Sequence, residues 1–233
     1  MPDAWNFTPS PRRAGPAVTT PYLTYLLCAL SVLITVAHNY PGALPGPFWL
    51  RLGAFGEADP DDLAAGRLWG LVTTVFIHGD WLHLLFNMIW LVQLGRILEL
   101  TLSPLIYPAF LIAAAAVGSA CELLVSGTTG IGMSGVVYAM FALMWAGRGM
   151  YPVWGAVATR PNLNVFIAWG LFCLAATWLR LLNVANGAHA GGFLFGLCIG
   201  FLFFVPRRRW VWAAPLALLL GASAFAVARL HYA

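Results

Sequence analysis

Seven long apolar runs alternate along the chain with shorter segments that are polar or rich in proline and glycine. A helix that crosses the roughly 30 Å hydrocarbon core of a bilayer needs about 20 mainly apolar residues. Several runs are bounded by Pro, Gly, Asn or Asp, as helix ends usually are. The pattern predicts an all-α fold, a polytopic transmembrane helical bundle, with spans at roughly 22–38, 81–98, 104–125, 134–150, 163–181, 187–205 and 210–229.

The stretch 40–80 does not follow this pattern. Four prolines interrupt it, yet Trp49, Phe55, Trp69 and Phe76 make it too aromatic for a solvated loop. We expect it to lie in or dip into the membrane interface. The predicted organisation is a short cytoplasmic segment over 1–21, a transmembrane core over 22–205 that includes this interfacial loop, and a basic loop with an extra C-terminal span over 206–233.

Composition supports a membrane protein and limits its partners. Of the 233 residues, 61% are hydrophobic and 9% are charged, against about 25% charged in soluble domains. The net charge of +4 is too small and too scattered for a nucleic-acid surface. The four cysteines lie far apart inside apolar runs, so neither a disulfide framework nor a zinc site is predicted.

The arginines predict the orientation of the bundle. If the N-terminus is cytoplasmic, eight arginines fall on the inner side and four on the outer side, as the positive-inside rule requires. The outer arginines are Arg51, Arg67, Arg180 and Arg229. We therefore expect a multi-pass membrane protein with its N-terminus inside. Because arginine and alanine are abundant and lysine is absent, we also expect a bacterial source and the bacterial inner membrane.

Polar residues within spans are costly, so the few that occur point to function. No carboxylate lies at the middle of a span, which argues against a proton-coupled transporter and an intramembrane aspartyl protease. His78 and His83 are five residues apart without an H-E-x-x-H pattern, so no metal site is predicted. The remaining polar residues are His83, Asn87, Ser134 and His189.

These four residues are predicted to lie at one shallow depth. If Asp80 caps the second span, His83 and Asn87 share one face within its first two turns. Ser134 opens the fourth span, and His189 follows Asn186, a candidate cap of the sixth. Because these three spans run from outside to inside, the four side chains can converge near the outer face.

A serine near a neutral histidine can act as a nucleophile. Ser134 and His189 could form such a dyad, with no carboxylate placed to complete a triad. His83, Asn87 and the Ser134 N–H could stabilise an oxyanion.

Neighbouring residues fit this chemistry. Gly132 and Gly135 permit close backbone approach, and Tyr138 lies one turn below Ser134, where its ring could pack on His189. Gly192 and Gly196 form a small-residue face that would bring the sixth span close to the fourth. His78 has two open interpretations, interface packing or holding water near the site.

The sequence resembles the rhomboid intramembrane serine proteases. The resemblance covers roughly residues 66 to 205 and rests on three motifs in order along the second, fourth and sixth spans. They are His78-x4-His83-x3-Asn87, Gly132-Met133-Ser134-Gly135-Val136-Val137-Tyr138-Ala139 and Gly187-Ala188-His189-x2-Gly192-x3-Gly196.

The resemblance implies specific roles. Ser134 would be the nucleophile, His189 the general base, and His83 and Asn87 the oxyanion hole, while Glu99 would be a structural hydrogen-bonding residue. Rhomboids cut transmembrane segments of other proteins near the outer membrane face and need no cofactor. Movement of the fifth span, about 163–181, and of the loop before Ser134 would admit substrate. The sequence does not indicate an oligomeric state.

Two features depart from the family pattern, and two other functions stay open. Gly70 follows Trp69 where the family often has Trp-Arg, and a seventh span is added to the six-helix core. The alternative functions are a catalytically inactive rhomboid-like protein that binds transmembrane clients, and a transporter with an outward polar vestibule. Inactive relatives typically lack the serine or the histidine, whereas this sequence has both Ser134 and His189. A transporter is less favoured because the spans carry no charge at their middle and no inverted repeat is evident.

Overall fold

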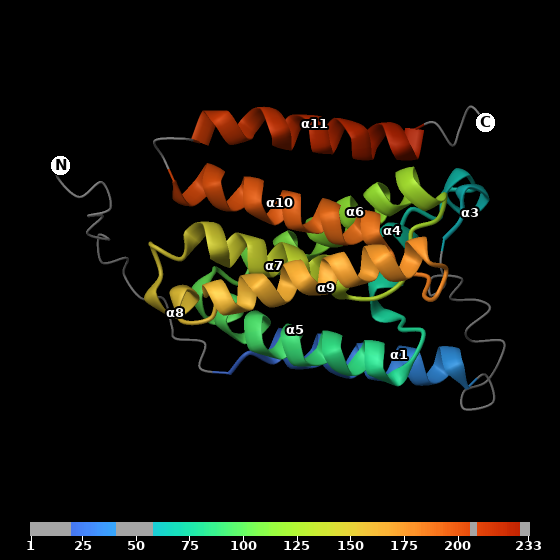
Figure 1. Ribbon diagram of the computed structural model, residues 1–233, viewed down its shortest axis with the longest axis horizontal. Helices are drawn as coiled ribbons and strands as arrows, with labels where there is room; N and C mark the ends of the chain where they lie inside the picture. The colour runs from blue at the N-terminus through green and yellow to red at the C-terminus, as the bar shows by residue number, and fades with distance from the viewer. Residues whose placement is uncertain (1–19, 41–57, 206–208, 229–233) are drawn as a thin grey trace.

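The protein is an all-helical bundle, described by a computed structural model over residues 20–40, 58–205 and 209–228 (Figure 1). No strand occurs in these ranges. The long helices are α1 (Tyr22–Asn39), α5 (Trp81–Thr101), α6 (Ile106–Ser126), α7 (Ser134–Gly147), α9 (Arg160–Trp178), α10 (Asn186–Phe204) and α11 (Arg209–Ala228). All seven predicted spans are therefore helical, within a few residues of the expected bounds.

Within the described residues, six of these helices are long and apolar enough to cross a membrane, and α7 is shorter. The predicted span 134–150 was too long, because α7 ends at Gly147 after 14 residues. Twelve of those residues, from Gly135 to Gly147 with Trp145 excepted, are buried. A helix that is apolar on every side packs among other helices, and α7 forms the centre of the bundle.

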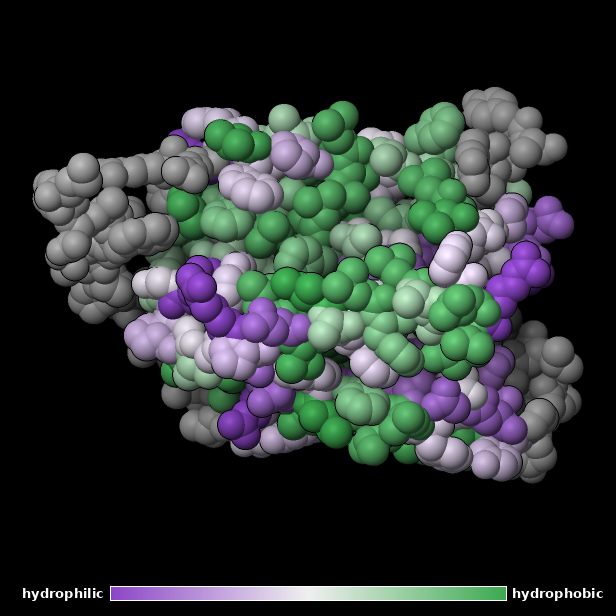
Figure 2. Space-filling view, in the orientation of Figure 1, coloured by the Kyte–Doolittle hydropathy of each residue, from purple (hydrophilic) through white to green (hydrophobic). Residues whose placement is uncertain are grey.

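The outer helices present apolar side chains to the surroundings. Leu85 and Ile89 of α5, Leu171 of α9 and Leu218 of α11 are all more than half exposed. Figure 2 shows such side chains over the middle of the visible face, with polar residues nearer the two ends. A surface of this kind fits lipid rather than water. The chain is therefore a multi-pass membrane protein.

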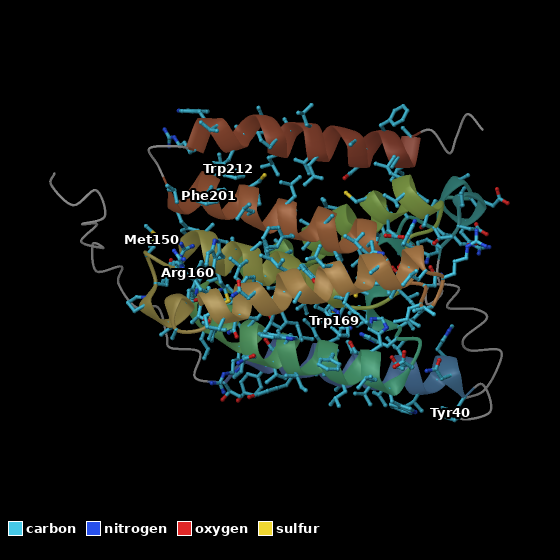
Figure 3. The ribbon with its side chains drawn as sticks, viewed as in Figure 1. Tyr40, Met150, Arg160, Trp169, Phe201 and Trp212 are labelled. Atoms are coloured by element: carbon cyan, nitrogen blue, oxygen red, sulfur yellow. The ribbon has the colours of Figure 1, made fainter. Side chains whose placement is uncertain are left out.

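The last helix, α11, lies at one edge of the bundle beside α10 (Figure 1). The rings of Phe201 on α10 and Trp212 on α11 stack with centroids 4.5 Å apart (Figure 3). Leu216 and Leu219 extend the same contact face. This helix covers the outside of the core and leaves α7 enclosed by the other helices.

Part of the predicted interfacial loop is described. Residues 58–80 form three short helices: α3 (Pro60–Ala64), α4 (Gly70–Thr73) and the 3₁₀ helix η1 (Thr74–Phe76). Another short helix, α8 (Pro152–Gly155), follows α7. The aromatic residues Trp49 and Phe55 lie outside the described residues, so the depth of this loop stays a prediction.

Candidate active site

The predicted nucleophile and base are in contact. The Nε2 atom of His189 lies 2.7 Å from the Oγ atom of Ser134, across 55 residues of sequence. Ser134 is the first residue of α7 and His189 lies in the first turn of α10, as the sequence predicted. A separation of 2.7 Å is a good hydrogen bond between a hydroxyl and a ring nitrogen. The serine proton can therefore pass directly to the imidazole.

The imidazole of His189 is held by packing. It is 6% exposed, and its ring stacks on Tyr138 with centroids 4.7 Å apart and an interplanar angle of 22°. This stacking confirms the contact predicted from the spacing of Ser134 and Tyr138. The Nδ1 atom has no hydrogen-bond partner among the described residues. No carboxylate among the described residues therefore binds this atom, as one does in a catalytic triad.

Glycines bring the two helices together. A methyl group at Gly192 would overlap the carbonyl oxygen of Gly135, and one at Gly196 would overlap that of Ala139. Backbone thus lies against backbone along this face of α7 and α10. The predicted close approach of the fourth and sixth spans is confirmed, and it explains why Ser134 and His189 can share a hydrogen bond.

His83 lies beside the loop that leads to Ser134. Asp80 caps α5 by accepting the N–H of His83 at 2.8 Å, as predicted. A Cβ at Gly132 would lie 2.6 Å from the His83 ring, and Gly132 has a φ of +104°. Only glycine fits both the left-handed backbone and the close ring. The ring is thus next to the backbone just before the nucleophile.

The side chain of Asn87 forms a hydrogen bond within its own helix. It is 5% exposed, and its Nδ2 atom donates to the carbonyl oxygen of His83 at 3.0 Å, one turn earlier in α5. One amide hydrogen is therefore engaged within its own helix. The second hydrogen is the one available for an oxyanion.

His78 is completely buried and bonded on both ring nitrogens. The N–H of Met133 donates to Nε2 at 3.3 Å, so the ring proton must be on Nδ1, which is 3.3 Å from the Thr35 hydroxyl. That hydroxyl in turn donates to the carbonyl oxygen of Phe76 at 3.2 Å. This chain of bonds ties α1 to the residue before Ser134, which favours packing over water binding as the role of His78.

Electrostatics keep His78 uncharged. Burial, and to a smaller extent the neighbouring His83, lowers the pKa of His78 to about 3. The two rings meet edge to face with centroids 4.9 Å apart. Because a protonated Nε2 cannot accept the Met133 N–H, the low pKa preserves this contact across the neutral range.

Glu99, near the end of α5, binds the start of α1. Its carboxylate accepts the N–H groups of Leu23 and Thr24, both at 2.8 Å, and the Thr24 hydroxyl at 2.7 Å. No side chain at Pro21 caps α1, so Glu99 supplies the acceptor that this helix end lacks. The contacts agree with the structural role that the resemblance implied.

The predicted cap of α10 is wrong. Asn186 is the first residue of the helix, and Ala185 occupies the cap position without a side-chain hydrogen bond. The Asn186 amide donates instead to Thr177 at the end of α9 and to Val184. Asparagine is common at several turn and cap positions. Here the contact with Thr177 of α9 determines where the Asn186 side chain binds.

Two contacts around the site have no signal in the local sequence. Thr35 binds His78 from α1, and Glu122 of α6 accepts the N–H of Ala188 at 3.1 Å. Both partners are distant in sequence, and neither residue belongs to a local motif. No group of three or more metal-ligating side chains occurs among the described residues.

Known proteins resemble this chain over most of its length. The Rhomboid domain model matches residues 65–206, more than half of the chain. The chain is 27% identical over 204 residues to the rhomboid protease GlpG of Salmonella choleraesuis, Salmonella enteritidis and Salmonella typhimurium. The match covers 84% of this chain and 66%, just under two thirds, of each relative. The chain belongs to the rhomboid family.

Proposed function

We propose that this protein is an intramembrane serine endopeptidase that cleaves transmembrane segments of other proteins near the outer face of a bacterial inner membrane. The observation that carries the proposal is the 2.7 Å contact between Ser134 Oγ and His189 Nε2. Membership of the rhomboid family and the relatives named rhomboid protease support it. The catalytic core is 22–205, with the N-terminus cytoplasmic and α11 added outside the core.

The reaction follows from the donors and acceptors at the site. Ser134 Oγ attacks the scissile carbonyl carbon while its proton moves to His189 Nε2. The resulting oxyanion is stabilised by the Ser134 N–H, the His83 ring and the second amide hydrogen of Asn87. His189 then donates the proton to the leaving amine, and a water molecule hydrolyses the acyl-enzyme by the same steps.

A serine-directed probe distinguishes this function from the inactive alternative. Purified wild-type protein should react with a fluorophosphonate, and mass spectrometry should find the adduct on Ser134. It should also cut a model transmembrane substrate. Protein that binds transmembrane clients but never reacts with the probe would instead be the inactive rhomboid-like protein.

The rate should fall at acidic pH because the base must be uncharged. An imidazolium at His189 cannot accept the serine proton, and a histidine ordinarily titrates near pH 6.5. His78 stays neutral until about pH 3, so it adds nothing to this acidic decline. Measured pH–rate profiles should therefore have the same acidic midpoint in wild type and in His78→Asn, whatever the maximal rate. A rate that does not fall at any acidic pH at which the protein stays folded would contradict the role of His189.

Helix α9, which is expected to move for substrate entry, packs against α5 and α7. Trp169 of α9, labelled in Figure 3, stacks on Phe86 of α5 with ring centroids 5.4 Å apart, and the ring of Phe166 packs on that of Trp90 with centroids 4.8 Å apart. The hydroxyl of Tyr138 also donates to the Phe166 carbonyl oxygen at 2.8 Å. These contacts favour the closed position of α9.

Trp169→Ala should increase cleavage of a transmembrane substrate. Because an aromatic pair contributes about 0.5–1.5 kcal/mol, its loss should raise the rate roughly two- to tenfold where opening limits cleavage. Cleavage assays in liposomes measure this. Trp178→Ala is the matched control, since Trp178 is 84% exposed at the end of the same helix. Equal rates for Trp169→Ala and wild type would mean that this contact does not restrain entry.

A further inference from the structure

Glu122 is a buried carboxylate that the proposed mechanism does not use. It lies on α6, is 4% exposed, and accepts the N–H of Ala188, the residue before His189. We propose that Glu122 is a positioning residue that sets the two segments carrying Ser134 and His189 relative to each other. This inference rests on the proposed serine protease function.

The first contact is with the start of α10. The first turn of a helix has N–H groups without partners inside the helix. Here the N–H of Asn186 reaches Val184 and that of His189 reaches Ala185, so Ala188 needs an acceptor from elsewhere. Ala185 has no side-chain acceptor. Glu122 therefore does from α6 what an aspartate or serine cap would do, and a negative charge is favourable at this helix end.

The second contact is with the loop that leads to Ser134. A Cβ at Gly130 would lie 3.1 Å from Cγ of Glu122, and 2.7 Å from Cβ of Ala185. Gly130 has a φ of +66°, so this close approach depends on glycine. The same side chain thus lies against the loop before the nucleophile and against the helix that carries the base.

The fit is equally close at Gly187. A Cβ there would lie 2.9 Å from a carboxylate oxygen of Glu122 and 2.9 Å from the carbonyl oxygen of Cys121. The first turn of α10 therefore sits directly on α6, with no room for a side chain. Any change that pushes this turn away also lengthens the hydrogen bond between Glu122 and Ala188.

The position of the first turn of α10 matters because few other contacts orient the His189 ring. Its Nδ1 atom has no hydrogen-bond partner among the described residues. The ring is held by the Tyr138 stack, by the hydrogen bond between Nε2 and Ser134, and by the backbone of α10. Because a misplacement of about 1 Å can lower a catalytic rate by about a hundredfold, the start of α10 must be held in place.

The test compares Glu122→Met, which keeps the length of the side chain but removes the acceptor, with Glu122→Gln, which keeps an acceptor oxygen. Glu122→Met should lower kcat about tenfold with little change in KM, and should slow fluorophosphonate labelling of Ser134 equally. Glu122→Gln should stay within about twofold of wild type. Val125→Ala is the control, since Val125 is 72% exposed on the same helix.

Gly187→Ala tests the contact from the other side without changing Glu122. It should lower kcat by a similar factor. In the double variant with Glu122→Met, kcat should fall by less than the product of the two single effects, because both substitutions disturb the same contact. If Glu122→Met does not fold, as judged by its thermal unfolding midpoint, the kcat of the Gly187→Ala variant tests the proposal in its place.

Several outcomes would overturn the inference. A Glu122→Met variant as active as wild type would do so, as would a lower unfolding midpoint with unchanged kcat, or a Glu122→Gln variant as impaired as Glu122→Met. Wild-type protein that never labels at Ser134 would overturn the proposed function as well. The two failures are distinguishable, because only the second leaves the wild type inactive.

Discussion

Ser134→Ala is expected to abolish both fluorophosphonate labelling and cleavage of a transmembrane substrate. The substitution removes the oxygen atom of the proposed nucleophile, while the neighbouring helices keep their contacts. Loss of the serine nucleophile in a well-studied serine protease lowers kcat by about six orders of magnitude. Single-turnover cleavage in liposomes, with the product quantified by mass spectrometry, covers that range.

The fold should survive this change. Ser134 is only partly buried, and its Oγ contributes one hydrogen bond, to His189. The thermal unfolding midpoint should therefore stay close to that of wild type. Ser103→Ala, an exposed serine between α5 and α6, is the matched control and should cleave normally. Undiminished cleavage by folded Ser134→Ala would disprove the proposed nucleophile.

Gly192→Val should also abolish activity, although it touches no reacting group. A side chain at Gly192 would overlap the carbonyl oxygen of Gly135, so α10 must move away from α7. The Oγ–Nε2 separation of 2.7 Å would then be lost. A shift of about 1 Å lowers the rate by about a hundredfold, and a larger one stops the reaction. Fluorophosphonate labelling and cleavage should fall together.

The control for this variant is Gly221→Val on α11, where a Cβ would have no neighbour within 4 Å. It introduces the same side chain into a transmembrane helix, yet it should cleave like wild type. Overpacking usually lowers stability by about 1–3 kcal/mol, so circular dichroism should check that Gly192→Val stays helical. Full activity in a helical Gly192→Val protein would mean that α7 and α10 do not need this contact.

Local sequence patterns predicted most of the bundle and the main contact of the site. The seven apolar runs correspond to the seven long helices, and Asp80 caps α5 as expected. The meeting of Ser134 and His189 followed from their equal depth in spans that run in the same direction. The glycines at 192 and 196 predicted the close approach of those helices.

Other features depended on partners far away in the chain. Asn186 has the composition of a cap but binds Thr177 instead. Nothing local distinguishes Glu122 from an ordinary acid at a helix end. Its contact with Ala188 exists because α6 packs against α10, although the two residues are 66 positions apart in the sequence.

The sequence by itself determined which segments become helices and in which turn of each helix the polar groups lie, because hydropathy and helix caps depend on neighbouring residues. Only the tertiary structure decided which hydrogen bonds those groups make. It assigned the ring proton of His78 by placing Met133 and Thr35 on its two sides, and it left Nδ1 of His189 without a partner within the part of the chain that the structure describes. Such contacts join distant helices, whose positions depend on how side chains of every helix pack at once.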